Sequence, residues 1–386
     1  MIVVGAGAST DSIWIISEIN EAYRPPVTDE VFTKPLFLAE FMSKRYGAAS
    51  LAPIVIGRVA REKSTLEEAL TKEYQQAQSN PTLRRGFVDL RLYLRDLFAA
   101  CTKEWPLQAG NATNYAWLVH EVEEWRERAD GYVLWVTFNY DGLLDDALQR
   151  VYRMEFGRRL ESFIADPDWA LLKLHGSYDW VRQTGWTASQ ASMTPNHPSR
   201  VLARVDNRHV YYDADRMLET EWRPEDQPLG AETGWLRKEG TAWTVSQRTA
   251  TLWAPALVPP LGDKAAFEAP TEHVAHLDAK LPDVDLSFTI GWRAQEQHFL
   301  EKLNAMSANP PDVLALSKDP AKATGYAQVV AAAAGTRDGF VPSTLRVDGL
   351  QYDGFSDLVK SRNQSFAAEL DDRMAIARRT RAARMK

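Results

Sequence analysis

The chain has 386 residues, of which 45% are hydrophobic, and its 45 basic and 52 acidic side chains give a net charge of −7. This length exceeds a typical single domain but suits one α/β core that carries insertions. The acidic balance argues against a surface devoted to nucleic-acid binding. The single cysteine, Cys101, excludes a disulfide framework and a thiolate zinc cluster, and it favours a reducing compartment. Because no apolar run reaches the roughly 18 residues of a membrane span and no signal-peptide pattern is present, we expect a cytoplasmic protein without membrane association.

The chain opens with a short apolar strand that runs into a glycine turn. Ile2 to Val4 predict the strand, Gly5 to Thr10 form the turn, and a helix is expected from Ser12 to Ala22. Glycines at such a turn let backbone N–H groups approach a diphosphate. The dehydrogenase fingerprint would place a third glycine at Thr10, so an ordinary hydride-transfer enzyme is disfavoured. The same residues also fit a tight turn that binds nothing.

A helical insertion is predicted over about residues 36–105, after a loop over residues 23–29 that we expect to fold over the glycine turn. Ser64 to Glu67 match a capping box and predict a helix that runs to about Gln78. Two further helices are indicated by apolar stripes at spacings of three and four residues. These stripes comprise Phe87, Leu90, Leu94, Leu97 and Phe98, and then Trp117, Leu118, Val122 and Trp125.

The central strand is predicted at Tyr132 to Val136, which is apolar without polar alternation, as in a parallel strand buried on both faces. A helical pattern follows from Gly142 to Tyr152, so Thr137 to Asp141 should form the turn at the carboxyl end of the strand. Ligands bind at this edge of open α/β sheets. Thr137, Asn139 and Asp141 are therefore candidate site residues. The alternative is that Asp141 caps the helix and Asn139 tolerates an awkward turn.

A second apolar strand, Trp169 to Leu174, ends in His175. This places an imidazole on the same rim as Asn139, where it suits general acid/base chemistry near neutral pH. An isolated histidine that bonds to backbone carbonyls is the alternative. Beyond it, residues of about 183–251 form an insertion rich in Trp and Arg.

The pattern as a whole predicts a Rossmann-like α/β fold, with a parallel sheet and helices on both faces. Asp312 to Ser317 read as a further strand and Thr324 to Ala334 as a helix. We expect residues 1–335 to form the core with its two insertions, and residues 336–386 to form a C-terminal extension with a basic helical tail.

Three of these segments resemble, in order and spacing, the nucleotide-site motifs of the sirtuin superfamily. They are Gly5-Ala6-Gly7-Ala8-Ser9, Thr137-Phe138-Asn139-Tyr140-Asp141 and Lys173-Leu174-His175-Gly176-Ser177. The match is closest to the bacterial sirtuin-like (silent information regulator type) branch of anti-phage defence. Ser287 to Trp292 is similar to the adenosine-side turn of that family, and Pro259-Pro260 with Lys264 resembles the segment before it.

The resemblance implies an NAD hydrolase that cleaves the nicotinamide–ribose bond, with NAD as substrate and no separate cofactor. Asn139 would orient the ribose or the attacking water, His175 would take the proton, and Asp141 would hold the site together. The expected NAD-binding residues are Gly5, Ala6, Gly7 and Ser9 at the diphosphate, together with Thr137, Gly291 and Trp292. Deacylating sirtuins carry a four-cysteine zinc module after the histidine, and this stretch has no cysteine, so no metal and no peptide cleft are expected.

Two other functions remain open at this point. The chain could bind NAD or ADP-ribose as a sensor or assembly subunit without turnover, or, against the missing cysteines, act as a deacylase. The resemblance also implies a homo-oligomer and a partner subunit such as a helicase-like ATPase or an Argonaute-like protein. Such contacts would control NAD depletion in abortive infection.

Overall fold

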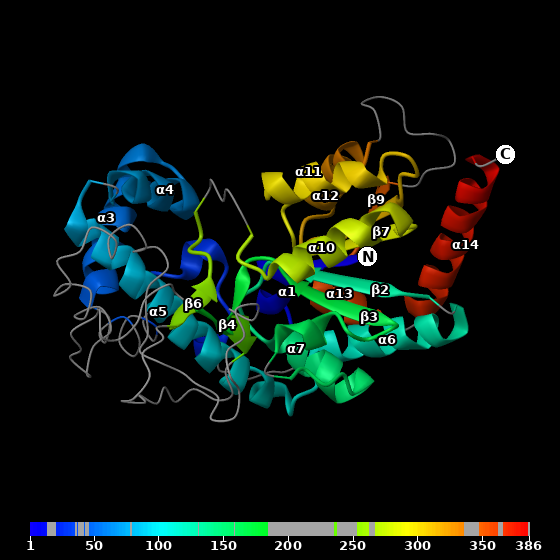
Figure 1. Cartoon of the computed structure of the whole chain (residues 1–386), viewed down its shortest axis with the longest axis horizontal. Helices are drawn as coiled ribbons and strands as arrows, with labels where there is room; N and C mark the ends of the chain where they lie inside the picture. The colour runs from blue at the N-terminus through cyan, green and yellow to red at the C-terminus, as the bar shows by residue number, and fades with distance from the viewer. Residues whose placement is uncertain are drawn as a thin grey trace.

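The chain folds around a six-stranded parallel sheet with helices on both faces, which confirms the predicted Rossmann-like α/β fold (Figure 1). The computed structural model describes all residues except 14–20, 35–36, 38–41, 43–45, 78, 130, 158, 184–234, 238–252, 262–266, 336–346, 362–365 and 385–386.

The strand order is β3-β2-β1-β7-β8-β9. The strands are β1 (Ile2–Val4), β2 (Val133–Thr137), β3 (Trp169–Lys173), β7 (Leu286–Ile290), β8 (Asp312–Leu316) and β9 (Val347–Gly349). If the parallel strands are numbered along the chain, their order is the doubly wound 3-2-1-4-5-6. Successive strands are added to one side of the first strand and then, from the fourth strand on, to its other side. The reversal here lies between β1 and β7.

Both faces of the sheet are buried, and alternate residues of β1, β2, β3 and β8 contribute to the two cores. One face packs against α6 (Asn114–Ala129), α7 (Leu143–Ala147), α13 (Phe355–Lys360) and α14 (Phe366–Arg384). The other packs against α10 (Thr271–Lys280), α11 (Gln297–Leu303) and α12 (Pro320–Ala333). A π-helical turn, Leu148–Tyr152, continues α7. Short 3₁₀ turns occur at Glu21–Tyr23, Thr28–Glu30, Pro106–Ala109, Leu160–Phe163, Leu281–Asp283 and Asn304–Met306.

A separate helical layer lies between β1 and β2 in the sequence. It comprises α3 (Tyr46–Glu62), α4 (Leu66–Ala77) and α5 (Pro81–Glu104), which share a third apolar core. Beside α5 is a three-stranded antiparallel sheet of β4 (Gly176–Gln183), β5 (Trp235–Arg237) and β6 (Trp253–Leu257). Figure 1 shows this layer on the left, beyond the carboxyl edge of the parallel sheet.

Two local predictions need correction. The first helix, α1 (Ala6–Thr10), begins directly after Gly5, and Ser12 lies outside it; the rest of the helix expected up to Ala22 falls mainly outside the described residues. The capping box is one residue later than expected, because Thr65 and Glu68 exchange the two hydrogen bonds.

The C-terminal extension, predicted to follow residue 335, contacts the core where the structure describes it. Strand β9 pairs with β8, and α14 packs on α6 through Phe366, whose ring lies 5.8 Å from that of Trp117. The first half of α14 is therefore part of the packed structure, with Phe366, Leu370 and Arg373 buried. Most of the Trp/Arg-rich insertion, and Lys264, lie outside the described residues.

Candidate active site

The carboxyl ends of the strands form one row, because the strand register aligns Val4 with Thr137 and with Ile290. The chain leaves this row as the glycine turn after β1, as Phe138-Asn139 after β2 and as Gly291-Trp292 after β7. These three segments, distant in sequence, therefore meet where the strand order reverses. This is the position at which open α/β sheets bind ligands.

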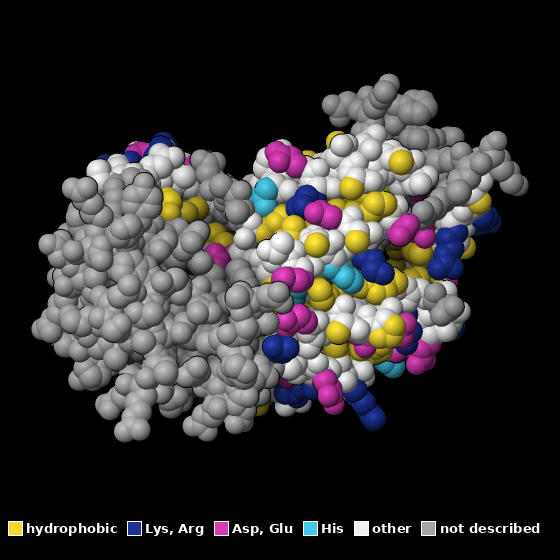
Figure 2. All heavy atoms as spheres, viewed as in Figure 1, with side chains coloured by type: hydrophobic (Ala, Val, Ile, Leu, Met, Phe, Trp, Pro, Cys, Tyr) yellow, Lys and Arg dark blue, Asp and Glu magenta, His cyan; other side chains and the backbone are white. Residues whose placement is uncertain are grey.

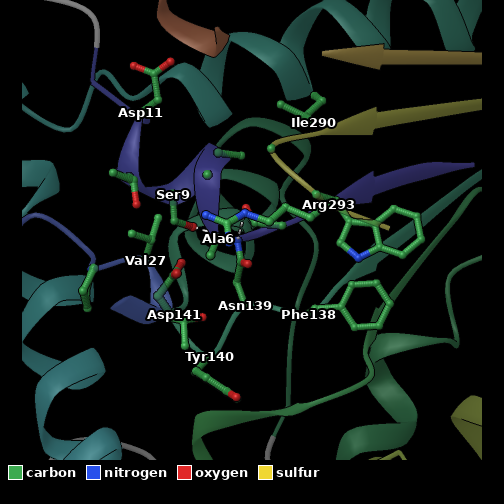
Figure 3. A pocket seen from close by; sticks show the side chains of 18 of the residues that line it. Ala6, Ser9, Asp11, Val27, Phe138, Asn139, Tyr140, Asp141, Ile290 and Arg293 are labelled. Carbon is green, nitrogen blue, oxygen red and sulfur yellow. Dashed lines mark hydrogen bonds between the residues drawn. The ribbon is translucent and has the colours of Figure 1, made fainter. Parts of the chain in front are cut away.

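A cavity of about 360 Å³ lies over this edge of the sheet (Figure 3). Its size falls within the range of small-molecule sites, roughly 300–1,000 Å³. Nine of the ten site residues predicted from the sequence line it, namely Gly5, Ala6, Gly7, Ser9, Asn139, Asp141, His175, Gly291 and Trp292. The expected loop after residue 23 also contributes, through Arg24, Pro26, Val27 and Thr28.

Thr137 is the exception, because it is the last residue of β2 and its side chain does not line the cavity. Its hydroxyl donates to the carbonyl of Val4 at 3.1 Å and accepts from the N–H of Asn139 at 3.1 Å. Thr137 therefore fixes the turn that presents Asn139. Although the resemblance implies that Thr137 contacts NAD, this residue does not line the cavity.

The glycines are required by close packing between two turns. The N–H groups of Gly5 and Gly7 donate to the carbonyls of Ile290 and Gly291, at 3.0 and 3.1 Å. A Cβ on Gly5 would lie 2.6 Å from the Gly291 carbonyl oxygen, and Gly291 itself has φ +61°. Because these two N–H groups are occupied, the turn offers a diphosphate fewer backbone donors than the resemblance implies.

Asn139 is held in one amide orientation. It is 6% exposed, and its Nδ2 donates to the Gly5 carbonyl at 3.0 Å and to the Ser9 hydroxyl at 2.9 Å. Since the Gly5 carbonyl can only accept, the NH₂ group must face it. The Oδ1 atom has no hydrogen-bond partner within the described part of the chain. It is therefore a buried acceptor whose hydrogen-bonding capacity is unsatisfied.

Tyr115 of α6 completes this network, although the sequence analysis did not identify it. Its buried hydroxyl lies 3.0 Å from the Ser9 hydroxyl and 3.4 Å from Asn139 Nδ2. Burial, with a smaller contribution from the charge of Asp141, raises the pKa of Tyr115 well above its usual value. The phenol is therefore neutral and can donate to Ser9.

Asp141 has a structural contact that favours the capping alternative. Its Oδ1 accepts from the N–H of Leu143, at the first residue of α7, at 3.1 Å. Burial raises the pKa of the Asp141 carboxyl, and the Lys173 ammonium opposes this shift. Lys173, itself fully buried, donates to the Asp141 carbonyl at 2.6 Å and pairs with Asp145 at 2.8 Å. Asp141 thus joins the cavity wall to a buried charged cluster.

His175 lies between aromatic rings, directly after β3. It is 1% exposed, and its ring centroid lies 4.8 Å from that of Phe138 and 6.1 Å from that of His298. The next residue, Gly176, has φ +77°, and a Cβ there would lie 1.9 Å from the Ala256 carbonyl oxygen. The turn after His175 therefore requires glycine, and it brings the imidazole to the same cavity as Asn139.

Three cations of the cavity wall were not identified from the sequence. Arg24 pairs with Glu30 at 2.8 Å, and Lys318 lies 4.0 Å from Asp11. The third, Arg293, is exposed and directly follows Trp292. Each of these cations lies close in sequence to a predicted loop or strand, which is the only local sign that it belongs to the site. Which of them pairs with a carboxylate depends on the tertiary structure.

The C-terminal segment also reaches the cavity. Gly354 and Phe355 line it, and Ser356 donates from its N–H and its hydroxyl to the Asp11 carboxylate, at 3.1 and 2.7 Å. The extension predicted to begin at residue 336 is therefore a part of the candidate site.

A second cavity, of about 260 Å³, lies at the opposite edge of the sheet, lined by residues such as Trp125, Leu286 and Met374. Figure 2 shows apolar side chains across the middle of the molecule, where Figure 1 places α10 and β2, with Lys and Arg toward α14. The second cavity has charged residues in its wall, Lys280, Asp283, Asp285 and Arg378, but it lies away from the carboxyl edge at which open α/β sheets bind ligands, so the first cavity is the better candidate for chemistry.

Within the described residues, no group of three or more His, Cys, Asp and Glu side chains is arranged to hold a metal ion. Cys101 is buried, and its burial raises the pKa of the thiol, so it is not an activated nucleophile. Among the helices that the structure describes, none combines the length and the apolar character needed to cross a membrane.

No model of a known protein family matches the chain, and no curated protein is significantly similar to it. Its function therefore has to be inferred from the cavity and the residues that line it.

Proposed function

We propose that the chain is an NAD hydrolase that cleaves the nicotinamide–ribose bond to give nicotinamide and ADP-ribose. The observation that carries this proposal is that Asn139 and His175, from the ends of two adjacent strands, line one cavity with the glycine turn at the switch point of the sheet. A dinucleotide-binding fold supplies the place, and these two side chains supply the polar groups that the reaction needs.

An aromatic wall on the same cavity suits a planar ring. Phe138 and Trp292 stack with centroids 5.3 Å apart and an interplanar angle of 16°. Trp292 is anchored by a hydrogen bond from its Nε1 to Glu296. Such a wall favours stacking of a base or nicotinamide ring.

In the proposed reaction, the bond between the ribose carbon and the nicotinamide nitrogen breaks, and its electron pair returns to the ring to give neutral nicotinamide. Water forms the new bond to the ribose carbon, which is oxocarbenium-like in the transition state, and its proton passes to His175. The free Oδ1 of Asn139 accepts a hydrogen bond from a ribose hydroxyl or from that water. Correct placement of the water is the main contribution of the site.

The resemblance to sirtuin-like defence proteins extends this proposal to its biology. An enzyme that depletes NAD is tolerated only when its competent state is rare, so we infer control by self-assembly or by a partner subunit such as a helicase-like ATPase or an Argonaute-like protein. A cytoplasmic location would give such an enzyme access to the NAD pool.

A binding function without turnover is the second candidate. It is favoured by the burial of His175, whose side chain is 1% exposed and therefore poorly placed to exchange a proton with solvent. Such a protein would hold NAD or ADP-ribose and would leave the bond intact.

The test is incubation of the purified full chain with NAD, followed by chromatographic and mass-spectrometric analysis of the products. Equal release of nicotinamide and ADP-ribose is expected, with loss of release in His175→Gln and normal release in His120→Gln, whose side chain is 60% exposed on α6. NAD binding by calorimetry without any product would instead support the sensor. Product formation that requires an acetyl-lysine peptide would support a deacylase.

A further inference from the structure

Arg293 is an exposed cation at the mouth of the cavity, at the end of the turn after β7. Figure 3 shows its side chain extending across the cavity toward Ala6, Ser9 and Asn139. It thus approaches the glycine turn from the β7 side of the site.

The backbone on either side of Arg293 is fixed by buried neighbours. Trp292 is 4% exposed and stacks on Phe138, while Ala294 is 6% exposed and has φ +54°. A non-glycine residue in the left-handed region is uncommon and persists only where its surroundings impose it. Arg293 is therefore carried on a rigid turn, which limits the backbone entropy lost on binding a ligand.

Arg293 differs from the other cations of the cavity in its pairing. Arg24 and Lys318 lie beside Glu30 and Asp11, as described above. Arg293 has no hydrogen bond or ion pair to any residue that the structure describes. Among the three cations of the described cavity wall, Arg293 is the one without a carboxylate within 4.0 Å.

The glycine turn by itself is poorly equipped to neutralise a diphosphate, since the N–H groups of Gly5 and Gly7 already bond to β7 and its turn. A diphosphate placed against this turn would need a cation from elsewhere. An arginine is well suited, because its planar guanidinium donates two parallel hydrogen bonds to phosphate oxygens.

We propose that Arg293 binds the diphosphate group of the dinucleotide in this cavity. This inference rests on the proposed function only in taking a dinucleotide as the ligand; it does not require turnover. The group recognised is a diphosphate ester, so ADP-ribose and NAD should both depend on Arg293.

The test is calorimetric binding of ADP-ribose and of adenosine, which lacks phosphate, to the full chain and to Arg293→Gln. Losing a charge-assisted hydrogen bond should weaken ADP-ribose binding about 10- to 100-fold and leave adenosine binding unchanged. Arg293→Lys should recover part of the affinity, because it restores the charge without the bidentate geometry. The matched control is Arg150→Gln, which removes a surface arginine paired with Asp146, and it should bind both ligands normally. Equal unfolding midpoints will show that the variants are folded.

Two results would overturn the inference: unchanged ADP-ribose affinity in Arg293→Gln, or no ADP-ribose binding by the wild-type chain. The outcome is separable from that of the proposed hydrolase. Arginine-dependent binding without nicotinamide release would reject the hydrolase and uphold Arg293 as the diphosphate ligand. Normal hydrolysis with an unchanged KM in Arg293→Gln would support the hydrolase and reject Arg293 as the diphosphate ligand.

Discussion

Replacing Gly291 by alanine should separate the two turns that form the floor of the cavity. The added Cβ would lie 2.2 Å from the backbone nitrogen of Ala8 and 2.6 Å from the carbonyl carbon of Gly7, both of which are backbone atoms. The left-handed conformation, φ +61°, costs a non-glycine residue about 1–2 kcal/mol. Overpacking in a tight site costs a further ~1–3 kcal/mol. We therefore expect the free energy of unfolding to fall by about 2–5 kcal/mol.

Denaturant unfolding monitored by tryptophan fluorescence measures this loss. The control is Gly57→Ala in α3, where the new Cβ would meet only the side chain of Arg61, at 3.8 Å. Alanine is favoured over glycine within a helix by about 0.5–1 kcal/mol, so this variant should be slightly more stable than wild type. If Gly291→Ala unfolds at the wild-type denaturant concentration while Gly57→Ala is stabilised, the tight contact between the turns is not real.

Three further outcomes follow from buried polar groups. Lys173→Met should lower the free energy of unfolding by about 3–5 kcal/mol, because it leaves the Asp145 carboxylate buried without its cation; a Lys173→Met/Asp145→Leu double variant that recovers no stability in urea unfolding would refute this reasoning. Burial lowers the pKa of His273 from 6.5 to about 4, so the unfolded state binds its proton more tightly. This contribution to stability is complete above pH 6.5 and is lost as the pH falls toward 4, by about 3 kcal/mol at 1.4 kcal/mol per pKa unit; unfolding midpoints over this range should be flatter for His273→Leu, and parallel profiles would disprove the assignment. Tyr115→Phe removes the hydroxyl beside Ser9 and should lower kcat for nicotinamide release about tenfold with KM unchanged; a rise in KM alone would show that Tyr115 does not act through Asn139.

Strands β2 and β3 could be predicted because both of their faces are buried. Val133–Thr137 and Trp169–Lys173 are continuous apolar runs bounded by turns, which a parallel strand between helices requires. The stripe on α5 was visible for the same reason, since Leu90, Leu94 and Leu97 all enter one core. In such elements the apolar pattern of the sequence indicates which faces are buried.

Shorter elements carried no such signal. Strand β9 has only three residues, and α13 only six, so both are shorter than the stretches over which apolar periodicity predicts a strand or a helix. Their places are set by pairing with β8 and by the contact of Ser356 with Asp11, both of which are long-range. The sequence therefore predicted this segment only as a C-terminal extension with a basic helical tail.

The residues of the candidate site that follow strand ends could be predicted from the sequence. Those whose role depends on hydrogen bonds or ion pairs in the tertiary structure could not. Asn139 and His175 each follow an apolar run, so the rule for parallel sheets places them on one edge. Tyr115 lies in a helix whose other apolar residues form core, and nothing local distinguishes its hydroxyl. Arg293 likewise stands out only once the partners of Arg24 and Lys318 are known.

The most direct measurement is nicotinamide release from NAD by the wild-type chain and by Asn139→Ala. The substitution should spare the fold, because the Gly5 carbonyl keeps its hydrogen bond from the N–H of Ala8 at 2.9 Å. The hydrolase proposal predicts stoichiometric nicotinamide and ADP-ribose from the wild type, none above background from Asn139→Ala, and wild-type rates from Asn304→Ala, an exposed asparagine next to α11. Undiminished release by a folded Asn139→Ala protein would contradict it.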